Sequence, residues 1–337
     1  MKILFIGGTG TISTACSRLA VDLGYEVALL NRGKRPVEIP GTRKIVADIH
    51  DPASVENALG GERFDVVANF INFMPEHIER DLELFKGRAG QYLFISSASV
   101  YQKPLATYLV TESTPLKNPF WQYSRDKIAC EERLNRAYRE DDFPMVIVRP
   151  SYTYDDKLFP LAVGGGAHFT VADRMLKGLP VVIHGDGSSL WTNTHADDFA
   201  KAFVGLFGNP QTLGEAFHIT SDEVLSWRQI YETLAHELGV EANVVYVPSD
   251  FIAQVDPGQA AGLLGDKAYS AVLDNTKIKR FVPTYQATIP LREGFRRNLV
   301  YYHADPSRKA ISERENASIE KILAAWGRID PARSGKT

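Results

Sequence analysis

The chain has 337 residues, of which 44% are hydrophobic and 23% charged, and its formal net charge is −3. This composition is typical of a globular protein and provides enough apolar residues for one large domain or two of common size. The nearly balanced charge argues against a general attraction to nucleic acid or to an anionic membrane. Two cysteines, Cys16 and Cys130, fit a reducing compartment, and no apolar run approaches about 18 residues, so we expect a cytoplasmic protein.

Strand-like and helix-like segments alternate along the first 150 residues. The predicted strands cover residues 3–6, 25–30, 44–47, 64–69, 91–95 and 144–148, and the predicted helices cover 13–21, 52–59, 75–86 and 121–139. Nearly all-apolar strands that alternate with helices predict an α/β fold, a Rossmann-type doubly wound parallel sheet. Ligands of such sheets bind at the carboxyl ends of the strands.

The alternation breaks near residue 151, where we expect a smaller C-terminal substrate lobe to begin. Further strands are predicted at 181–185 and 215–219, and an amphipathic segment carries Ile319, Ile322, Leu323 and Trp326. We therefore predict a dinucleotide-binding domain over 1–155 with returning segments at about 181–220, a substrate lobe over 156–180 and 221–303, and a C-terminal helix and tail over 304–337.

A glycine-rich turn, Gly7-Gly8-Thr9-Gly10, joins the first predicted strand to the first predicted helix. In this context glycines let a diphosphate approach the backbone and bind the N–H groups at the helix N-terminus. A tight turn with no ligand is the alternative, and the usual third glycine is replaced by Ser13. The residues expected to contact a dinucleotide here are Gly7, Thr9, Gly10, Thr11 and Ile12.

Tyr123 and Lys127 are four residues apart on a predicted helix and therefore share one face. The lysine ammonium can lower the pKa of the phenol and make it a usable proton acceptor from an alcohol. Ser97 follows the fifth predicted strand and could bond the same substrate oxygen. An incidental surface pair is the alternative for Tyr123 and Lys127.

The order of these motifs resembles that of the extended short-chain dehydrogenase/reductases, the nucleotide-sugar epimerase/dehydratase group. The residues that carry the resemblance are Gly7 to Gly10, Asp48 to Asp51, Ser96 to Tyr101, Tyr123 to Lys127 and Arg149-Pro150. It implies that Ser97, Tyr123 and Lys127 are catalytic and that Lys127 also holds the nicotinamide ribose. It further implies a set of cofactor-binding residues, namely Asp48, Ile49, Asn69, Phe70 and Pro150.

The segment after Ser97 narrows the reaction that the resemblance implies. Dehydratases of this family carry an acidic pair where this chain has Ala98 and Ser99, and epimerases that work beside a carbonyl carry a cysteine at Ser99. The sequence is similar instead to the 4-epimerase version. We expect hydride transfer at a secondary alcohol or ketone of a sugar or nucleotide sugar, by epimerisation or by simple redox chemistry, and no dehydration.

The end of the second predicted strand bears on the cofactor. A carboxylate there would bind the ribose 2′-hydroxyl of NAD, whereas this chain has Asn31-Arg32 with Lys34 and Arg35 close behind. Positive charge suits the 2′-phosphate of NADP, so we expect NAD(P) with NADP favoured over NAD. A solvated basic loop is the alternative.

Substrate recognition is where the resemblance weakens. Gly185-Asp186-Gly187 and His195 to Asp198 match the sugar-nucleotide enzymes, but the arginine that grips the diphosphate is replaced by Trp191, which could stack on a ligand or fill the core. We expect Ser99, Tyr152 and Trp191 to face the substrate. The histidines have no metal-ligand spacing, so no metal is expected.

This variant is similar to a subgroup that includes the plant chloroplast stem-loop RNA-binding proteins. An RNA-binding or regulatory protein that keeps the fold and the cofactor site is therefore the alternative function, although the net charge argues against nucleic acid as a partner. The expected partner is a small-molecule sugar or nucleotide sugar, and a homodimer is possible.

Overall fold

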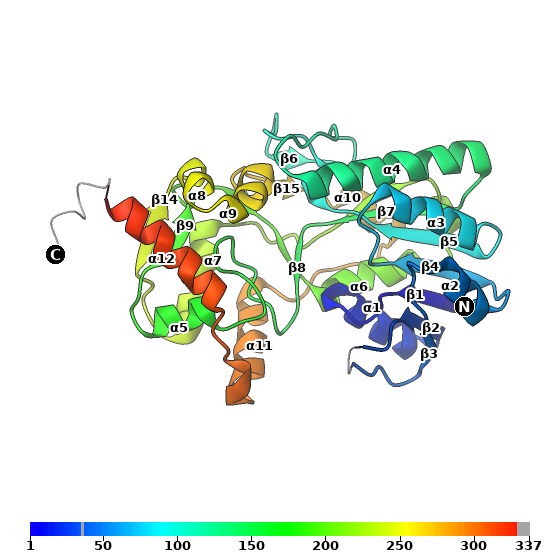
Figure 1. Cartoon of the computed structure of the whole chain (residues 1–337), viewed down its shortest axis with the longest axis horizontal. Helices are drawn as coiled ribbons and strands as arrows, with labels where there is room; N and C mark the ends of the chain where they lie inside the picture. Colours follow the sequence, from blue (N-terminus) through cyan, green and yellow to red (C-terminus); the bar gives the residue numbers. More distant parts are fainter. Residues whose placement is uncertain (35–36, 329–337) are drawn as a thin grey trace.

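The computed structural model describes residues 1–34 and 37–328. Seven parallel strands form one sheet in the order β12-β7-β5-β4-β1-β2-β3 (Figure 1). They are β1 (Lys2–Ile6), β2 (Glu26–Asn31), β3 (Thr42–Val46), β4 (Phe64–Asn69), β5 (Ala89–Ile95), β7 (Met145–Pro150) and β12 (Ala216–Ile219). The Rossmann-type sheet predicted from the alternating pattern is therefore present, and its strand order reverses between β1 and β4, where α/β sheets bind ligands.

Helices cover both faces of this sheet, as its continuous apolar strands require. Helices α1 (Thr11–Asp22) and α6 (Ala196–Gly205) pack with one set of strand side chains, which includes Phe5 and Val66. The opposite face packs on α2 (Pro52–Leu59), α3 (Pro75–Phe85) and α4 (Gln122–Asp141). The side chains of Ile3 to Ile6 have no exposed surface, so the glycine turn leaves the sheet from its most buried part.

Of the remaining elements, a few short ones pack with the large sheet and its helices, and most form the second half of the molecule (Figure 1). Its helices are α5 (Thr170–Leu176), α7 (Trp227–Leu238), α8 (Ser249–Val255), α9 (Pro257–Gly262), α11 (Leu291–His303) and α12 (Glu313–Gly327), and α10 (Thr276–Phe281) packs near β12. Short turns are the 3-10 segments η1 (Ala98–Val100), η2 (Pro210–Thr212) and η4 (Pro306–Arg308), and the π-helical η3 (Leu263–Lys267). Four two-stranded pairs complete it: β6 (Leu109–Val110) with β15 (Val272–Leu273), β8 (Tyr152–Tyr154) with β11 (Asn193–His195), β9 (Val181–His184) with β14 (Val244–Val247), and β10 (Leu190–Trp191) with β13 (Leu225–Ser226).

One strand differs from the expected layout. The strand expected to return to the large sheet near residue 181 is formed as β9, but it pairs with β14 in the second half of the molecule. Only β12 returns, beside β7. The physical reason is burial: Val181 to Ile183 pack with Val245 and Val247 in the apolar cluster of the second half, whose centre is α7.

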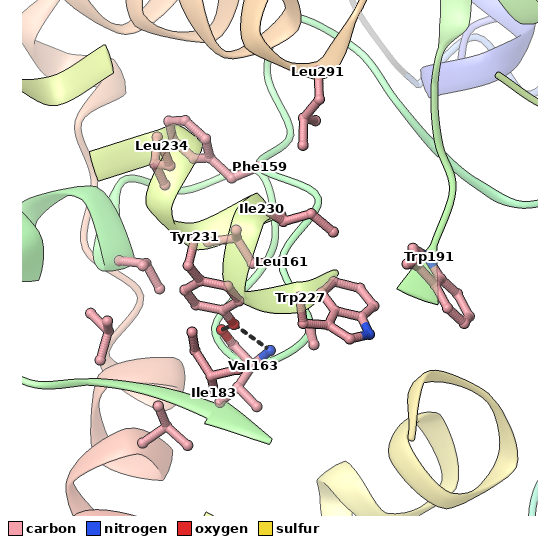
Figure 2. Close-up of a cluster of buried hydrophobic side chains, with 14 of the residues drawn as sticks. Phe159, Leu161, Val163, Ile183, Trp191, Trp227, Ile230, Tyr231, Leu234 and Leu291 are labelled. Carbon is pink, nitrogen blue, oxygen red and sulfur yellow. Dashed lines mark hydrogen bonds between the residues drawn. The ribbon is translucent and has the colours of Figure 1, made fainter. Parts of the chain in front are cut away.

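Figure 2 shows this cluster around α7, where Tyr231 lies between Leu161 and Ile183, and Trp227 lies on the side that faces Trp191. The Tyr231 hydroxyl accepts from the backbone nitrogen of Val163 at 2.9 Å and donates to its carbonyl oxygen at 2.7 Å. The amphipathic C-terminal segment docks here as well, since Ile319 and Ile322 of α12 are buried in the same cluster. The last predicted tail residues, 329–337, lie outside the described part of the chain. Among the described residues, no helix combines the length and the apolar character needed to cross a membrane.

Candidate active site

The glycine turn between β1 and α1 is built by backbone geometry. Gly7 has a φ of +79°, and a Cβ there would lie 2.5 Å from Ile71, while a Cβ on Gly8 would lie 2.6 Å from Leu29. These two glycines are therefore required by the protein itself. Gly10 is different, because its φ is −91° and a Cβ would contact only Ser13 Oγ, at 3.4 Å. The open space beside Gly10 fits a ligand that approaches the backbone.

Ser13 stands in place of the usual third glycine and has a bonding role. Its hydroxyl donates to the Gly7 carbonyl oxygen at 2.8 Å and accepts from the Gly10 backbone nitrogen at 2.8 Å. Ser17, one turn later, donates to the Gly8 carbonyl oxygen at 3.1 Å. Both serines are buried, so the turn is braced by side chains of α1. Within the described residues, α1 has no acidic side chain in its first turn, and its positive N-terminal end faces the turn.

A cavity of about 540 Å³, which we call the glycine-loop cavity, lies at the carboxyl ends of β1, β2 and β4. Ten of the residues predicted to bind the dinucleotide line it: Gly7, Thr9, Gly10, Thr11, Ile12, Asn31, Arg32, Asp48, Ile49 and Phe70. A cavity of this size with an open glycine turn fits a dinucleotide. His50, Phe73 and His77 also line it. His50 belongs to the Asp48 to Asp51 motif but was not assigned a role, and Phe73 and His77 belong to no recognisable motif.

Two predicted cofactor residues lie elsewhere. Pro150 lines the neighbouring cavity described below. Asn69 is buried and does not line either cavity; its amide nitrogen donates to Asp81 at 2.6 Å and to Asn72 at 3.0 Å. Its Oδ1 accepts from the backbone nitrogen of Ile71 at 2.9 Å. Asn69 therefore shapes the loop after β4 from behind, because its polar atoms are used within the protein.

The end of β2 presents basic side chains to the glycine-loop cavity. Arg32 and Lys34 both line it and are exposed, and Asn31 Oδ1 accepts from the Gly33 backbone nitrogen at 2.8 Å. This bond leaves the Asn31 amide hydrogens as donors toward the cavity. Arg35, which the sequence places in the same loop, lies outside the described residues.

Two of the three predicted catalytic residues meet at a second cavity, of about 290 Å³, which we call the Tyr123 cavity, whereas Lys127 is buried and lines neither cavity. Ser97 and Tyr123 both line it, and Ser97 Oγ lies 2.9 Å from Ser99 Oγ, which also accepts from Ser124 Oγ at 2.7 Å. The two cavities meet near the end of β5, where Ile95 lines one and Ser97 the other. A substrate hydroxyl beside Ser97 and Tyr123 would therefore lie next to the glycine-loop cavity.

Burial raises the pKa of the Tyr123 phenol, and its hydrogen bond with Ser97 acts in the opposite direction. Lys127 does not bond the phenol: its Nζ lies 5.7 Å from the centre of the Tyr123 ring and donates to the carbonyl oxygens of Asn72, at 2.5 Å, and Ile95, at 2.7 Å. Burial lowers the pKa of Lys127 to about 8. Burial therefore sets the direction of the Tyr123 pKa, and the expected lowering by Lys127 is not seen in this structure.

The helix that carries Tyr123 is anchored to the sheet by a buried ion pair. Arg149, at the end of β7, donates from Nε to Glu131 Oε1 at 3.0 Å and from Nη2 to Glu131 Oε2 at 2.6 Å. Arg149 also donates to the Tyr101 hydroxyl at 3.0 Å. This pairing fixes the distance between α4 and the strand ends, and with it the position of Tyr123.

The three residues predicted to face the substrate, Ser99, Tyr152 and Trp191, all line the Tyr123 cavity. Trp191 is also part of the core, since 5% of its surface is exposed and its ring centre lies 5.3 Å from that of Trp227. Trp191 therefore fills the core at the edge of the cavity, and its stacking on a ligand stays a prediction. Three charged residues in this wall were not predicted, because they follow no motif: Lys103, Asp266 and Lys267.

A model of the NAD dependent epimerase/dehydratase family matches residues 3–220. The chain belongs to this family. Among curated relatives, it is 27% identical to a 2′-dehydrokanamycin reductase of Streptomyces kanamyceticus, over 85% of this chain and 80% of the relative. It is also 27% identical to the chloroplast stem-loop binding protein of 41 kDa b of Arabidopsis thaliana, over 74% of this chain and 67% of the relative. The resemblance drawn from the motifs is confirmed.

Solved structures have the same fold. The UDP-glucose 4-epimerase of Thermus thermophilus, in complex with NAD, superposes with a TM-score of 0.71 at 21% identity and covers 90% of this chain and 99% of its own. The UDP-glucuronic acid 4-epimerase of Bacillus cereus, in complex with UDP-glucuronic acid and NAD, gives 0.69 at 20% identity over 90% and 99%. An NAD(P) cofactor is typical of the family. In the described ranges, 1–34 and 37–328, no group of three His, Cys, Asp or Glu side chains could hold a metal ion.

Proposed function

We propose that this protein is an NAD(P)-dependent epimerase or oxidoreductase that transfers hydride at a secondary alcohol or ketone of a sugar, and that it is not a dehydratase. The observation that carries the proposal is the position of Ser97 and Tyr123 in one cavity, directly beside the glycine-loop cavity. The 2′-dehydrokanamycin reductase and the UDP-glucose 4-epimerases among its relatives support the same class of chemistry.

A nicotinamide bound in the glycine-loop cavity supplies the hydride acceptor or donor. Tyr123 exchanges the proton of the substrate oxygen at its phenolic oxygen, and Ser97 Oγ holds that oxygen by a hydrogen bond. Because burial raises the pKa of Tyr123, the phenol stays protonated at neutral pH and suits proton donation to a ketone. Lys127, fixed by two carbonyl oxygens beside the phenol, places a positive charge where the dinucleotide and the substrate meet.

The exclusion of dehydration rests on the wall after Ser97. Elimination of water needs an acid-base pair near the reacting carbons, and η1 offers Ala98 and Ser99 at these positions. The carboxylate in the cavity, Asp266, is paired with Lys103 at 3.4 Å and comes from η3, far from Ser97 in the sequence. The site therefore supplies groups for proton exchange at oxygen.

The test is the substitution Tyr123→Phe. The matched control is Tyr138→Phe, on the exposed part of the same helix. We expect Tyr123→Phe to lower turnover by about 10²–10⁴-fold, because the proton-exchanging group is removed, while dinucleotide affinity stays unchanged. Turnover is followed as oxidation of reduced dinucleotide by a panel of keto sugars and as interconversion of UDP-glucose and UDP-galactose. Unchanged turnover in Tyr123→Phe would refute the proposal.

Mass spectrometry of small molecules released on denaturation separates the two reaction types. A retained dinucleotide favours epimerisation, in which the hydride returns to the substrate, and a protein purified without it favours a reductase that exchanges its cofactor. The RNA-binding alternative is supported by the chloroplast stem-loop binding relative. A gel shift with stem-loop RNA at low and high salt tests it, and no shift at low salt removes it.

A further inference from the structure

The charged residues that line the Tyr123 cavity include more positive than negative groups. They are Lys103, Asp266 and Lys267. Lys103 is almost fully buried and pairs with Asp266, with 3.4 Å between Nζ and Oδ1. Among the described residues, no carboxylate lies within 4.0 Å of Lys267 Nζ. Asp266 pairs with Lys103, and its charge also raises the pKa of Lys267 against the effect of burial, so two ammonium groups in the wall of this cavity share one carboxylate.

Lys267 lies deep in the wall and is held in place by its neighbours. Its backbone carbonyl accepts from Trp227 Nε1 at 3.1 Å, and its Nζ lies 5.5 Å from the centre of the Tyr152 ring. The side chain is partly accessible, through the cavity that it lines, and burial lowers its pKa. A lysine placed in this way carries a desolvation cost that an anionic ligand would offset.

Trp191 adds a second, independent sign of a ligand. It lines the same cavity, and its indole nitrogen is buried without a hydrogen-bond partner among the described residues. Buried donors are nearly always paired, so this unpaired donor, on a residue that lines the cavity, is available to an acceptor that a ligand brings. The ring cannot turn away, because it packs against Trp227 (Figure 2) and its strand pairs with β13 through Leu225.

The volume limits the size of this ligand. Small-molecule sites commonly enclose about 300–1,000 Å³, and the Tyr123 cavity, at about 290 Å³, lies at the lower end of that range. Trp191 and Trp121 occupy two of its walls. These dimensions suit a single sugar ring with one substituent better than a sugar joined to a nucleoside diphosphate.

We propose that the Tyr123 cavity selects a compact sugar that carries one anionic group, either a carboxylate or a phosphate ester, and that Lys267 and the Trp191 indole N–H bind this group. The inference rests on the proposed function, since it names the substrate class of the same site. Lys103 and Asp266 neutralise each other and set the position of the wall. The sugar ring then lies between the anion-binding wall and the pair Ser97 and Tyr123.

Binding and turnover are measured separately so that the two proposals can fail independently. Isothermal titration calorimetry on the dinucleotide-loaded full chain uses glucuronate, glucose 6-phosphate, glucose, glucosamine and UDP-glucose as probes. We expect at least one of the two small anions to bind about tenfold or more tightly than glucose or glucosamine, because a charge-assisted hydrogen bond is gained. The preferred anion tells a carboxylate from a phosphate ester.

Variants then assign the binding to named residues. Lys267→Met should lower the affinity for the preferred anion by about tenfold to a hundredfold, whereas Lys267→Arg should keep most of that affinity. Trp191→Phe should lower the affinity for the same anion by about threefold to tenfold. Lys177→Gln, an exposed lysine paired with Asp173 in the second half of the molecule, is the matched control and should change nothing.

Several results would overturn the inference: equal binding of glucose and both small anions, preferred binding of glucosamine or UDP-glucose, or unchanged anion affinity in Lys267→Met. Anion binding without turnover would leave this inference standing and remove the proposed function. Turnover of a neutral sugar with no anion preference would remove this inference and leave the proposed function standing.

Discussion

The glycine-loop cavity and the Tyr123 cavity share a border at the end of β5 but are built in different ways. The first contains the glycine turn, whose backbone forms part of its wall, together with apolar and basic side chains at the ends of parallel strands. The second is lined by aromatic and charged side chains, several of which come from short elements such as η3 and β10. Backbone geometry is set by the fold, whereas side chains can change with little effect on it. We therefore expect the first cavity to set the cofactor, and the second, which holds Ser97 and Tyr123, to set the reaction and the substrate.

Tyr123 keeps its position in the second cavity only if α4, the helix that carries it, is held rigidly. Glu131→Gln removes the charge that compensates the buried Arg149, so we expect the free energy of unfolding to fall by about 3–5 kcal/mol. Urea denaturation measures this loss. The matched variant Glu140→Gln breaks an exposed pair with Arg136 on the same helix and should cost at most about 0.5 kcal/mol. Equal effects of the two variants would show that the buried pair is not what anchors α4.

The glycine-loop cavity contains one position where side-chain charge should decide the ligand. Arg32→Ala removes a guanidinium at the end of β2, so we expect affinity for NADP to fall by about tenfold while affinity for NAD changes by less than about twofold. Titration with each dinucleotide measures both values. The change Lys44→Ala, on the neighbouring strand β3 in an exposed pair with Glu38, serves as the control. An equal loss for both dinucleotides would contradict the preference for NADP that we propose.

The smallest expected effect concerns the departure from the glycine pattern. Ser13→Gly restores the usual third glycine but removes the two hydrogen bonds that brace the turn. We expect the free energy of unfolding to fall by about 1–2 kcal/mol, with dinucleotide affinity little changed. Thermal unfolding with and without dinucleotide measures both effects. If Ser13→Gly were more stable than the parent chain, Ser13 would be only a packing variant, and its hydrogen bonds with Gly7 and Gly10 would not stabilise the turn.

Much of the fold could be predicted because strand and helix patterns are local. The segment at 64–69 was predicted with the bounds of β4, and the helix at 52–59 with those of α2, since Asp51, Pro52 and Gly60 mark its two ends. The pairing of β9 with β14 was missed because the sequence of an apolar strand does not show which sheet it joins. That choice depends on packing against residues more than 50 positions away.

The candidate site shows the same difference between local sequence signals and long-range packing. Residues in motifs at strand ends, such as Gly10 and Tyr123, could be placed in advance, and they line the two cavities. Lys103 and Lys267 could not, because 164 residues separate them and neither belongs to a motif. Lys127 shows a third limit: its spacing from Tyr123 was visible, but its bonds to the carbonyl oxygens of Asn72 and Ile95 depend on the tertiary structure.

The π-helical turn η3 has a consequence for retargeting the protein. Residues 263–273 contribute Asp266, Lys267, Ala271 and Leu273 to the Tyr123 cavity, and in the described part of the chain none of these eleven residues lines the glycine-loop cavity. Exchange of this one short segment would alter the charge and shape presented to the sugar and leave the dinucleotide machinery untouched. A library restricted to these positions is thus a compact starting point for engineering new substrate preferences on an unchanged redox scaffold.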